Sequence, residues 1–251
     1  MTALQGRTAL ITGASAGIGA ATARALAGAG AHVLLAARRA ERLEALAAEL
    51  SAAGPGSAEA LTLDVRDAAA VQAAFAGREV HLAVANAGLA RGVASLQEGD
   101  PSDWSEMVDT NVKGVLHVIR AALPGMLERG GGDLVLLGSV AGRQVYPGGN
   151  VYNATKHGVR ALYEALRLDA GGRGVRFTTV DPGMVHTEFS EVRLGDADAA
   201  AAVYAGMEPL RPDDVADAIL YAVTRPPHVN IGEVVLWPTC QASTRDVTRT
   251  P

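Results

Sequence analysis

The stretch TALITGASAGIG, residues 8–19, decides the fold. Thr8–Ile11 is a short apolar run typical of a buried strand, and Ile18–Ala27 carries apolar residues at helical spacing. Glycines between a strand and a helix permit a tight turn and a close approach of the backbone to a pyrophosphate. The helix N-terminus then presents unpaired N–H groups and the positive end of its dipole to an anion. An ordinary glycine-rich turn is the alternative. We predict a dinucleotide-binding loop, formed by Gly13, Ser15, Gly17, Ile18 and Gly19.

Short apolar runs alternate with longer helical patterns along the rest of the chain. The predicted strands are Thr8–Ile11, His32–Ala36, Ala60–Leu63, Leu82–Ala85, Leu134–Leu137, Arg176–Val180 and Glu233–Trp237. The predicted helices are Ile18–Ala27, Ala40–Ala53, Ala68–Ala76, Trp104–Leu127, Val151–Asp169 and Asp213–Val223. This alternation predicts an α/β fold: a doubly wound parallel sheet of seven strands with helices on both faces.

No repeat or linker divides the chain, so we expect one domain over residues 1–251, with its core at about 6–237. Residues 188–206 interrupt the alternation and predict a small helical lid over the substrate site. Residues 238–251 have no strong periodicity, which leaves a disordered tail or an arm on a neighbouring subunit as the alternatives.

The composition narrows the class of protein. The chain is 49% hydrophobic and 20% charged, with a net charge of −5, which gives no reason to expect nucleic acid or an anionic membrane as a partner. A single cysteine, Cys240, excludes an intramolecular disulfide. The start of the chain has no apolar signal region, and no run reaches the roughly 18 apolar residues of a membrane span. We therefore expect a cytoplasmic protein.

The end of the second predicted strand indicates which dinucleotide binds. An acidic residue there would bind the ribose hydroxyls of NAD, but the chain continues with Arg38 and Arg39. Guanidinium groups grip a 2′-phosphate through charge-assisted hydrogen bonds, whereas a carboxylate repels it. One Arg could instead cap the sheet or pair with Glu41 or Glu44. We predict NADP as the cofactor, with Arg38 favoured as the phosphate ligand.

Further cofactor contacts are predicted after the third and fourth strands. Asp64 and Val65 are placed to bind the adenine ring, although an Asp after a strand is more often a turn residue or a helix cap. Asn86, Ala87 and Gly88 are small enough for the backbone to run beside the adenosine ribose.

Tyr152 and Lys156 lie four residues apart at the start of a helical pattern, which places both on one helix face. A nearby ammonium favours the phenolate and brings tyrosine towards the range useful for acid–base catalysis. Alone, this spacing usually means an ordinary amphipathic helix. Here Ser139 follows the fifth strand, and Asn111 lies within a predicted helix beside the unfavourable Gly114, a conflict that often marks function.

From Thr8 to about Trp237 the chain resembles the short-chain dehydrogenase/reductase family, which has a Rossmann fold. The motifs stand in the family's order: the glycine loop, Asn86-Ala87-Gly88, Asn111, Ser139, Tyr152 with Lys156, then Pro182-Gly183 and Thr187. Ala85 departs from the family, which usually has another Asn there with a mainly structural role.

The resemblance implies a role for each motif residue. Tyr152 would exchange the proton of the substrate oxygen, Ser139 would hydrogen-bond that oxygen, and Lys156 would lower the pKa of Tyr152 and orient the nicotinamide ribose. Asn111 would hold a water that links Lys156 to solvent. The nicotinamide end would be wrapped by Pro182, Gly183, Val185 and Thr187. No metal is expected, because the six histidines are scattered without ligand spacing.

A closer resemblance is to the NADP-dependent 3-hydroxy acid dehydrogenases, which act on serine, allo-threonine and related acids and are typically tetramers. It rests on residues 86–90, 107–111, 147–152, 187–190 and 228–231. It implies a small alcohol or carbonyl substrate, a homo-oligomer, and a cation for the carboxylate, with Arg143 and Arg193 as the candidates. One alternative is a reductase of larger aldehydes or ketones. Another is a non-catalytic NADP sensor, but such a protein would not need an intact Ser139, Tyr152 and Lys156.

Overall fold

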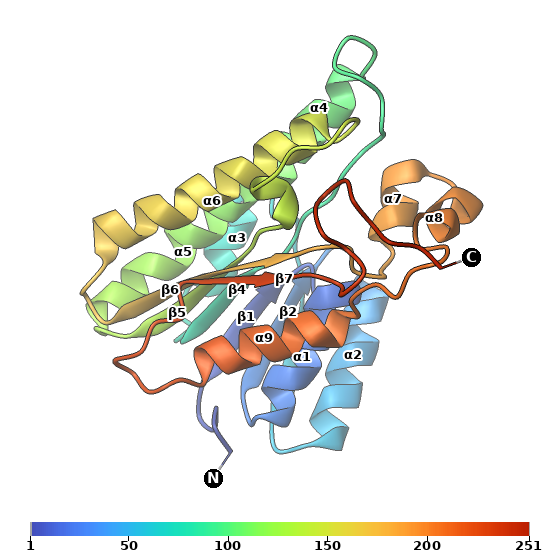
Figure 1. The fold of residues 1–251 in the computed structure, drawn as a ribbon. Helices are drawn as coiled ribbons and strands as arrows, with labels where there is room; N and C mark the ends of the chain where they lie inside the picture. Colours follow the sequence, from blue (N-terminus) through green and yellow to red (C-terminus); the bar gives the residue numbers. More distant parts are fainter. Residues whose placement is uncertain (1, 251) are drawn as a thin grey trace.

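The computed structural model describes residues 2–250. Within this range seven parallel strands form one sheet in the order β3-β2-β1-β4-β5-β6-β7 (Figure 1). The strands are β1 (Thr8–Thr12), β2 (His32–Ala37), β3 (Ser57–Thr62), β4 (Leu82–Ala85), β5 (Gly132–Leu137), β6 (Val175–Pro182) and β7 (Glu233–Leu236). The order reverses between β1 and β4, and in such sheets ligands bind at this switch point.

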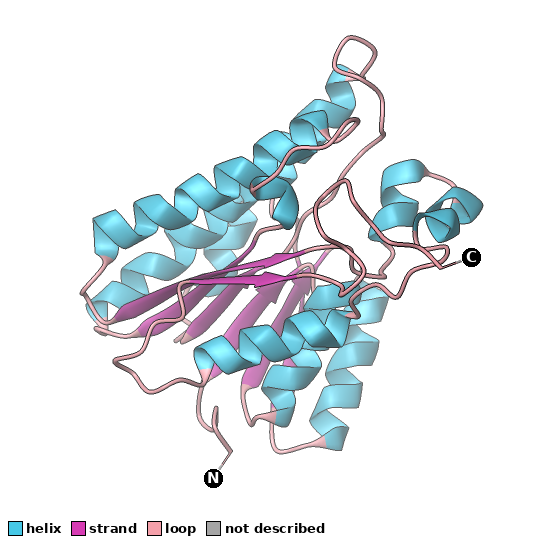
Figure 2. Cartoon of the chain, viewed as in Figure 1, coloured by secondary structure: helices cyan, strands magenta, loops and turns pink. Residues whose placement is uncertain are grey.

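Helices cover both faces of the sheet (Figure 2). On one face lie α1 (Gly17–Gly28), α2 (Ala40–Ala53) and α9 (Pro212–Val223). On the other lie α3 (Ala68–Phe75), α5 (Gly114–Glu128) and α6 (Asn150–Ala170). The predicted doubly wound α/β fold is confirmed, and every predicted strand and helix has a counterpart in the structure.

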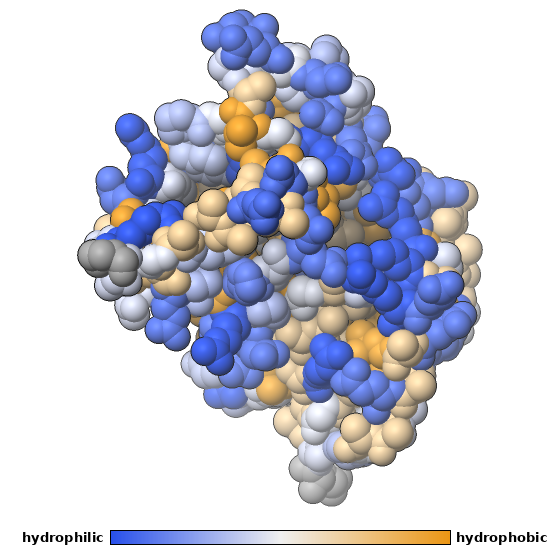
Figure 3. All heavy atoms as spheres, turned by 90° about the vertical axis from the view of Figure 1, so that its right-hand side faces the viewer, coloured by the Kyte–Doolittle hydropathy of each residue, from blue (hydrophilic) through white to orange (hydrophobic). Residues whose placement is uncertain are grey.

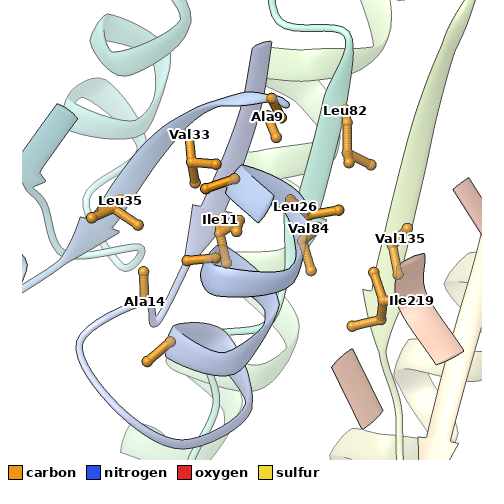
Figure 4. Packing of buried hydrophobic residues seen from close by; sticks show 14 of the residues in the cluster. Ala9, Ile11, Ala14, Leu26, Val33, Leu35, Leu82, Val84, Val135 and Ile219 are labelled. Carbon is orange, nitrogen blue, oxygen red and sulfur yellow. The ribbon is translucent and has the colours of Figure 1, made fainter. Parts of the chain in front are cut away.

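The alternation of side chains along the strands explains the two layers. In β1, Ile11 packs towards α1 together with Val33, Leu35 and Val84 (Figure 4). Leu10 packs in the cluster on the opposite face. Because successive strand residues point to opposite faces, strands that are apolar throughout are buried on both sides. The small side chains of α1 allow this helix to lie close to the sheet and to α9.

The long helix predicted over Trp104–Leu127 is interrupted. It starts earlier as α4 (Pro101–Val108), passes through one π-helical turn at Asp109–Lys113, and continues as α5. Such turns are frequent at functional sites and place one side chain out of the regular helical register. Asn111 lies in the middle of this turn.

The lid and the tail lie at the carboxyl ends of the strands. The lid contains α7 (Phe189–Leu194) and α8 (Ala197–Val203), as expected of a small helical insertion. The tail is ordered through Thr250 and folds back on its own lid, where the Thr250 N–H donates to Gly206 O at 2.7 Å (Figure 1). This contact within the chain does not fit a disordered tail, whereas an arm on a neighbouring subunit stays a prediction.

Candidate active site

A cleft of about 610 Å³ opens where the carboxyl ends of the strands meet the lid and the tail. Figure 3 shows this end of the molecule, where small hydrophobic patches lie among hydrophilic side chains. The predicted residues that line the cleft are Gly13, Ser15, Gly17, Ile18, Arg38, Arg39, Asp64, Val65, Asn86, Ala87, Gly88, Ser139, Tyr152, Lys156, Pro182, Gly183, Val185 and Thr187. Gly19 and Asn111 are buried outside its lining.

The glycine loop is shaped by its contacts with β4. Gly13 has φ +68°, and a Cβ atom there would lie 2.8 Å from Asn86 Nδ2. That amide in turn donates to Thr12 O at 2.8 Å, so the side chain of Asn86 holds the loop and leaves its backbone facing the cleft. Gly19 packs directly against the carbonyl of Gly13, and this contact supports the loop.

The start of α1 fits an anionic group. Its N-cap is Ala16, whose side chain caps no N–H group, and the first turn contains no acidic residue among the residues described. Free N–H groups and the positive end of the helix dipole therefore face the cleft at Gly17 and Ile18. This geometry suits a pyrophosphate.

The two predicted phosphate ligands have different surroundings. Arg38 lines the cleft, is exposed, and makes no hydrogen bond within residues 2–250. Arg39 donates to Ser15 Oγ at 3.0 Å and to a Glu188 carboxylate oxygen at 2.8 Å. Glu188 also accepts from Arg42 at 2.6 Å, which joins the start of the lid to the rim of the cleft. Arg38 is therefore the guanidinium that is free to take a phosphate, whereas Arg39 is shared with Glu188.

Asp64 and Val65 line the same side of the cleft. Asp64 is paired with Arg66 at 2.6 Å, and this hydrogen bond lowers the pKa of its carboxyl group against the opposing effect of burial. The carboxylate is therefore ionised near neutral pH and can accept hydrogen bonds through both oxygens.

Tyr152 and Lys156 lie on one face of α6, as their spacing predicts. Both are buried, with the Lys156 Nζ atom 5.8 Å from the centre of the Tyr152 ring. Nζ donates to Leu137 O at 2.8 Å. An ammonium has three donors, so this contact leaves others for a ligand in the cleft.

Burial dominates the acid–base properties of this pair. It raises the pKa of Tyr152 above the usual value, and hydrogen bonding with Ser139 and the charge of Arg193 oppose the rise less strongly. It also lowers the pKa of Lys156 to about 8, with the Asp181 carboxylate acting in the opposite direction. Burial outweighs the effects that lower the Tyr152 pKa, and the lowering by Lys156 that the resemblance implies stays a prediction. In this form of the protein Tyr152 is a proton donor at neutral pH.

Asn111 is fully engaged by protein groups. Its Oδ1 accepts from Leu89 N at 2.8 Å, and its Nδ2 donates to Leu89 O at 2.7 Å and to Thr155 Oγ1 at 3.1 Å. Asn111 also lies close to Lys156, since both side chains flank Gly88. A Cβ atom on Gly88 would be 3.2 Å from Asn111 Oδ1 and 3.7 Å from Lys156 Nζ. Asn111 thus joins the loop after β4 to α6 beside Tyr152 and Lys156.

The sequence left two arginines as candidate cations for the substrate carboxylate, and the structure gives them different surroundings. Arg143 is bound by the carboxylates of Asp181 and Glu233 and lies outside the lining of the cleft. Arg193, on α7, lines the cleft and donates to Tyr146 OH at 2.8 Å. The choice between these arginines depended on which elements meet in space, which local sequence patterns do not report.

Several residues that line the cleft were not named as candidate site residues. Among them are Tyr146, Phe189, Tyr204, Gln241 and Thr244. Phe189 packs on Tyr152 with ring centres 5.4 Å apart, and Gln241 and Thr244 come from the tail. An aromatic residue within a predicted lid was a usable signal for Phe189, whereas nothing local marked the tail residues.

Comparisons with known proteins agree with this geometry. The family model described as short chain dehydrogenase matches residues 7–196. Sulfoacetaldehyde reductase 2 of Chromohalobacter salexigens is 46% identical over 93% of this chain and 94% of its own length. The NADP-dependent 3-hydroxy acid dehydrogenase of Salmonella typhi is 42% identical over 93% of this chain and 95% of its own length.

Among solved structures, the closed form of a serine dehydrogenase complexed with NADP⁺ superposes with a TM-score of 0.89. It is 39% identical in sequence, and the match covers 97% of this chain and 100% of that one. The cofactor of that complex is the one predicted from Arg38 and Arg39.

Proposed function

The chain belongs to the short-chain dehydrogenase family, and on this premise we propose that it is an NADP(H)-dependent oxidoreductase of small acidic substrates. It interconverts a hydroxyl and a carbonyl group on a molecule that also carries a carboxylate or a sulfonate, such as a 3-hydroxy acid or its semialdehyde. The names of the relatives, a sulfoacetaldehyde reductase and a 3-hydroxy acid dehydrogenase, support this substrate class.

The proposal rests on the surroundings of Arg193. Its guanidinium is half-buried in the cleft wall, and its partners are the oxygens of Gly92, Tyr146 and Gly148. No carboxylate within residues 2–250 forms an ion pair with it. A partly desolvated cation without a counter-ion favours an anionic ligand. Its charge also acts on Tyr152, so a bound anion lies near the reacting group.

The fit of the cofactor follows from the cleft. The free N–H groups at the start of α1 suit the pyrophosphate, and Arg38 suits the 2′-phosphate. When bound, NADPH supplies the hydride to the carbonyl carbon. Asp64 and Val65 are assigned to the adenine, and Pro182–Thr187 to the nicotinamide end.

The residues of the chain supply the proton and the electrostatic stabilisation. Tyr152, which is protonated at neutral pH, donates its proton to the substrate oxygen during reduction. Ser139 stabilises the negative charge that develops on this oxygen. Lys156 carries positive charge beside the phenol and favours its ionised form once the proton has left. The water held by Asn111 stays a prediction.

A panel of matched substrates tests the proposal. We expect NADP⁺ reduction with L-serine, L-allo-threonine, 3-hydroxypropionate or isethionate, and a much lower kcat/KM with the neutral 3-hydroxypropanamide, because only the acids can pair with Arg193. Turnover of bulky ketones with no activity on any acid would overturn the substrate class. The binding of NADPH without any turnover would instead favour the NADP sensor.

The assembly and location of the protein stay predictions. We propose a homo-oligomer, a tetramer or a dimer, that works in the cytoplasm. Within residues 2–250 no helix is both long and apolar enough to span a bilayer. Sedimentation of the purified protein tests the assembly.

A further inference from the structure

The tail after β7 is tied to several parts of the cleft in the same chain. Its Thr244 N–H donates to Gln144 Oε1 at 3.1 Å, next to the loop that follows β5. Further along, Arg249 donates to the carbonyls of Val203 and Ala205 at the end of α8. Gln241 comes before both contacts in the tail, is buried, and lines the cleft.

Gln241 uses both ends of its side chain. Its Oε1 accepts from Met184 N at 2.9 Å, and its Nε2 donates to Ser243 O at 3.1 Å. Met184 lies within Pro182–Thr187, the loop assigned to the nicotinamide end. The tail is therefore joined to this loop by a partly buried hydrogen bond, which is worth more than a fully exposed one.

The same loop is held from its other side by Leu210. Met184 O accepts from Leu210 N at 2.9 Å, and His186 N donates to Leu210 O at 2.8 Å. Gly183 N donates to Leu236 O at 2.7 Å. A Cβ atom on Gly183 would lie 2.5 Å from Gln241 Oε1, so the amide is packed directly against the loop. Gln241 and Leu210 hold the backbone of Met184 between them.

We propose that Gln241 is a positioning residue for hydride transfer. It rests on the proposed function and deepens it: the tail sets the position of the loop Pro182–Thr187, and this loop sets how the nicotinamide faces the substrate beside Tyr152. Gln241 acts on the position of the reacting atoms through its contacts with Gly183 and Met184. Small displacements of a positioned reactant reduce rates strongly, so loss of this contact acts on the hydride step more than on affinity. The adenosine half of the cofactor, held at α1 and Arg38, supplies binding that Gln241 does not touch.

Gln241→Met tests the proposal, because it keeps the length of the side chain and removes both hydrogen bonds. We expect kcat for reduction to fall about tenfold, with a larger primary deuterium isotope effect from deuterated NADPH and a dissociation constant for NADPH within about twofold of the wild type. Gln241→Glu keeps an acceptor for Met184 N and should restore part of kcat. Gln241→Glu also tests the proposal if the Met variant does not fold.

Arg249→Ala is the matched control. It removes tail contacts with α8 and leaves the contact with Met184, so its isotope effect should equal that of the wild type even if the KM for the substrate rises. An unchanged isotope effect and kcat in Gln241→Met would overturn the proposal. An equal increase in Arg249→Ala would also overturn it, since the effect would then belong to the tail as a whole.

A measurement without turnover separates this proposal from the proposed function. In hydrogen exchange of the NADP⁺ complex, the Met184 amide should exchange faster in Gln241→Met than in the wild type and in Arg249→Ala. If no acidic substrate is turned over but this amide exchanges faster, the substrate proposal fails and the contact is confirmed as the anchor of the loop. Equal exchange in all three proteins would overturn the anchoring itself.

Discussion

The dinucleotide half of the cleft and its substrate half are built from different kinds of chain. The dinucleotide half consists of the turns that directly follow β1, β2, β3 and β4, and its shape depends on glycines and backbone groups. The substrate half consists of the lid, the tail and the loop before α6, and its surface is made by side chains such as Arg193, Tyr146 and Gln241. Tyr152 and Lys156 lie where the halves meet. The dinucleotide half thus presents mainly backbone groups, with Arg38 and Asp64 as side-chain candidates, whereas the substrate half presents side chains that are distant in the sequence.

Tyr152→Phe affects the junction of the halves and should have the largest effect. Removal of the hydroxyl group removes the proton donor, so we expect kcat to fall about 1,000-fold with little change in the dissociation constant for NADPH. Tyr163→Phe, another buried tyrosine of α6, should leave kcat within about twofold. Steady-state kinetics and NADPH fluorescence titration measure both. Comparable losses in the two variants would show a structural role.

Arg38→Asp acts on the dinucleotide half alone. A carboxylate in place of the free guanidinium repels the 2′-phosphate, so the preference for NADPH over NADH in kcat/KM should fall about 100-fold. The relative order of the acidic substrates should not change. A preference equal to that of the wild type would assign the phosphate to another group.

Arg193→Leu acts on the substrate half. Loss of a charge-assisted hydrogen bond of about 2 kcal/mol lowers kcat/KM for 3-hydroxypropionate about 30-fold. The kcat/KM for the neutral 3-hydroxypropanamide and the KM for NADPH should not change. Equal losses for the acid and the amide would mean that the guanidinium supports the lid and does not bind the substrate.

The pH dependence of stability tests how the junction is buried. Burial lowers the pKa of Lys156 to about 8 from 10.5, so from pH 8 to 10.5 the native state holds fewer protons than the unfolded state. The contribution of this group to the free energy of unfolding therefore increases as the pH rises through that window. It is lost again as the pH falls through 8. Lys156→Met removes this contribution, and the increase between pH 8 and 10 should be smaller by about 2 kcal/mol in urea unfolding. Equal slopes in both proteins would show that Lys156 is hydrated.

Glu188→Gln should have the smallest effect, because its partners are half-exposed. Glu188 joins the lid to Arg39 and Arg42, so its loss leaves Arg39 free for the 2′-phosphate and lowers the KM for NADPH about twofold. Glu191→Gln, exposed on the same helix, is the control. A higher KM for NADPH would show that the bridge helps to retain the cofactor.

Local patterns were sufficient wherever a structure depends on neighbours in the chain. The strands were predicted from apolar runs, and the glycine loop from its position between a strand and a helix. The family resemblance assigned Ser139, Tyr152 and Lys156, which the fold does bring to one cleft. The π-helical turn was not predicted, and the contacts of Asn111 at its centre with Leu89 and Thr155 join segments that local sequence patterns do not relate.

By itself, the sequence determined the doubly wound sheet, the dinucleotide loop and the motif residues around Tyr152. Each depends on periodicity or on a spacing of a few residues, which the backbone converts directly into geometry. Only the tertiary structure decided that Arg193 and not Arg143 faces the cleft, that Glu188 takes part of Arg39, and that the tail returns to Met184 through Gln241. These contacts join residues far apart in the chain, and whether a side chain is free or paired depends on which distant groups the packing brings within hydrogen-bond distance.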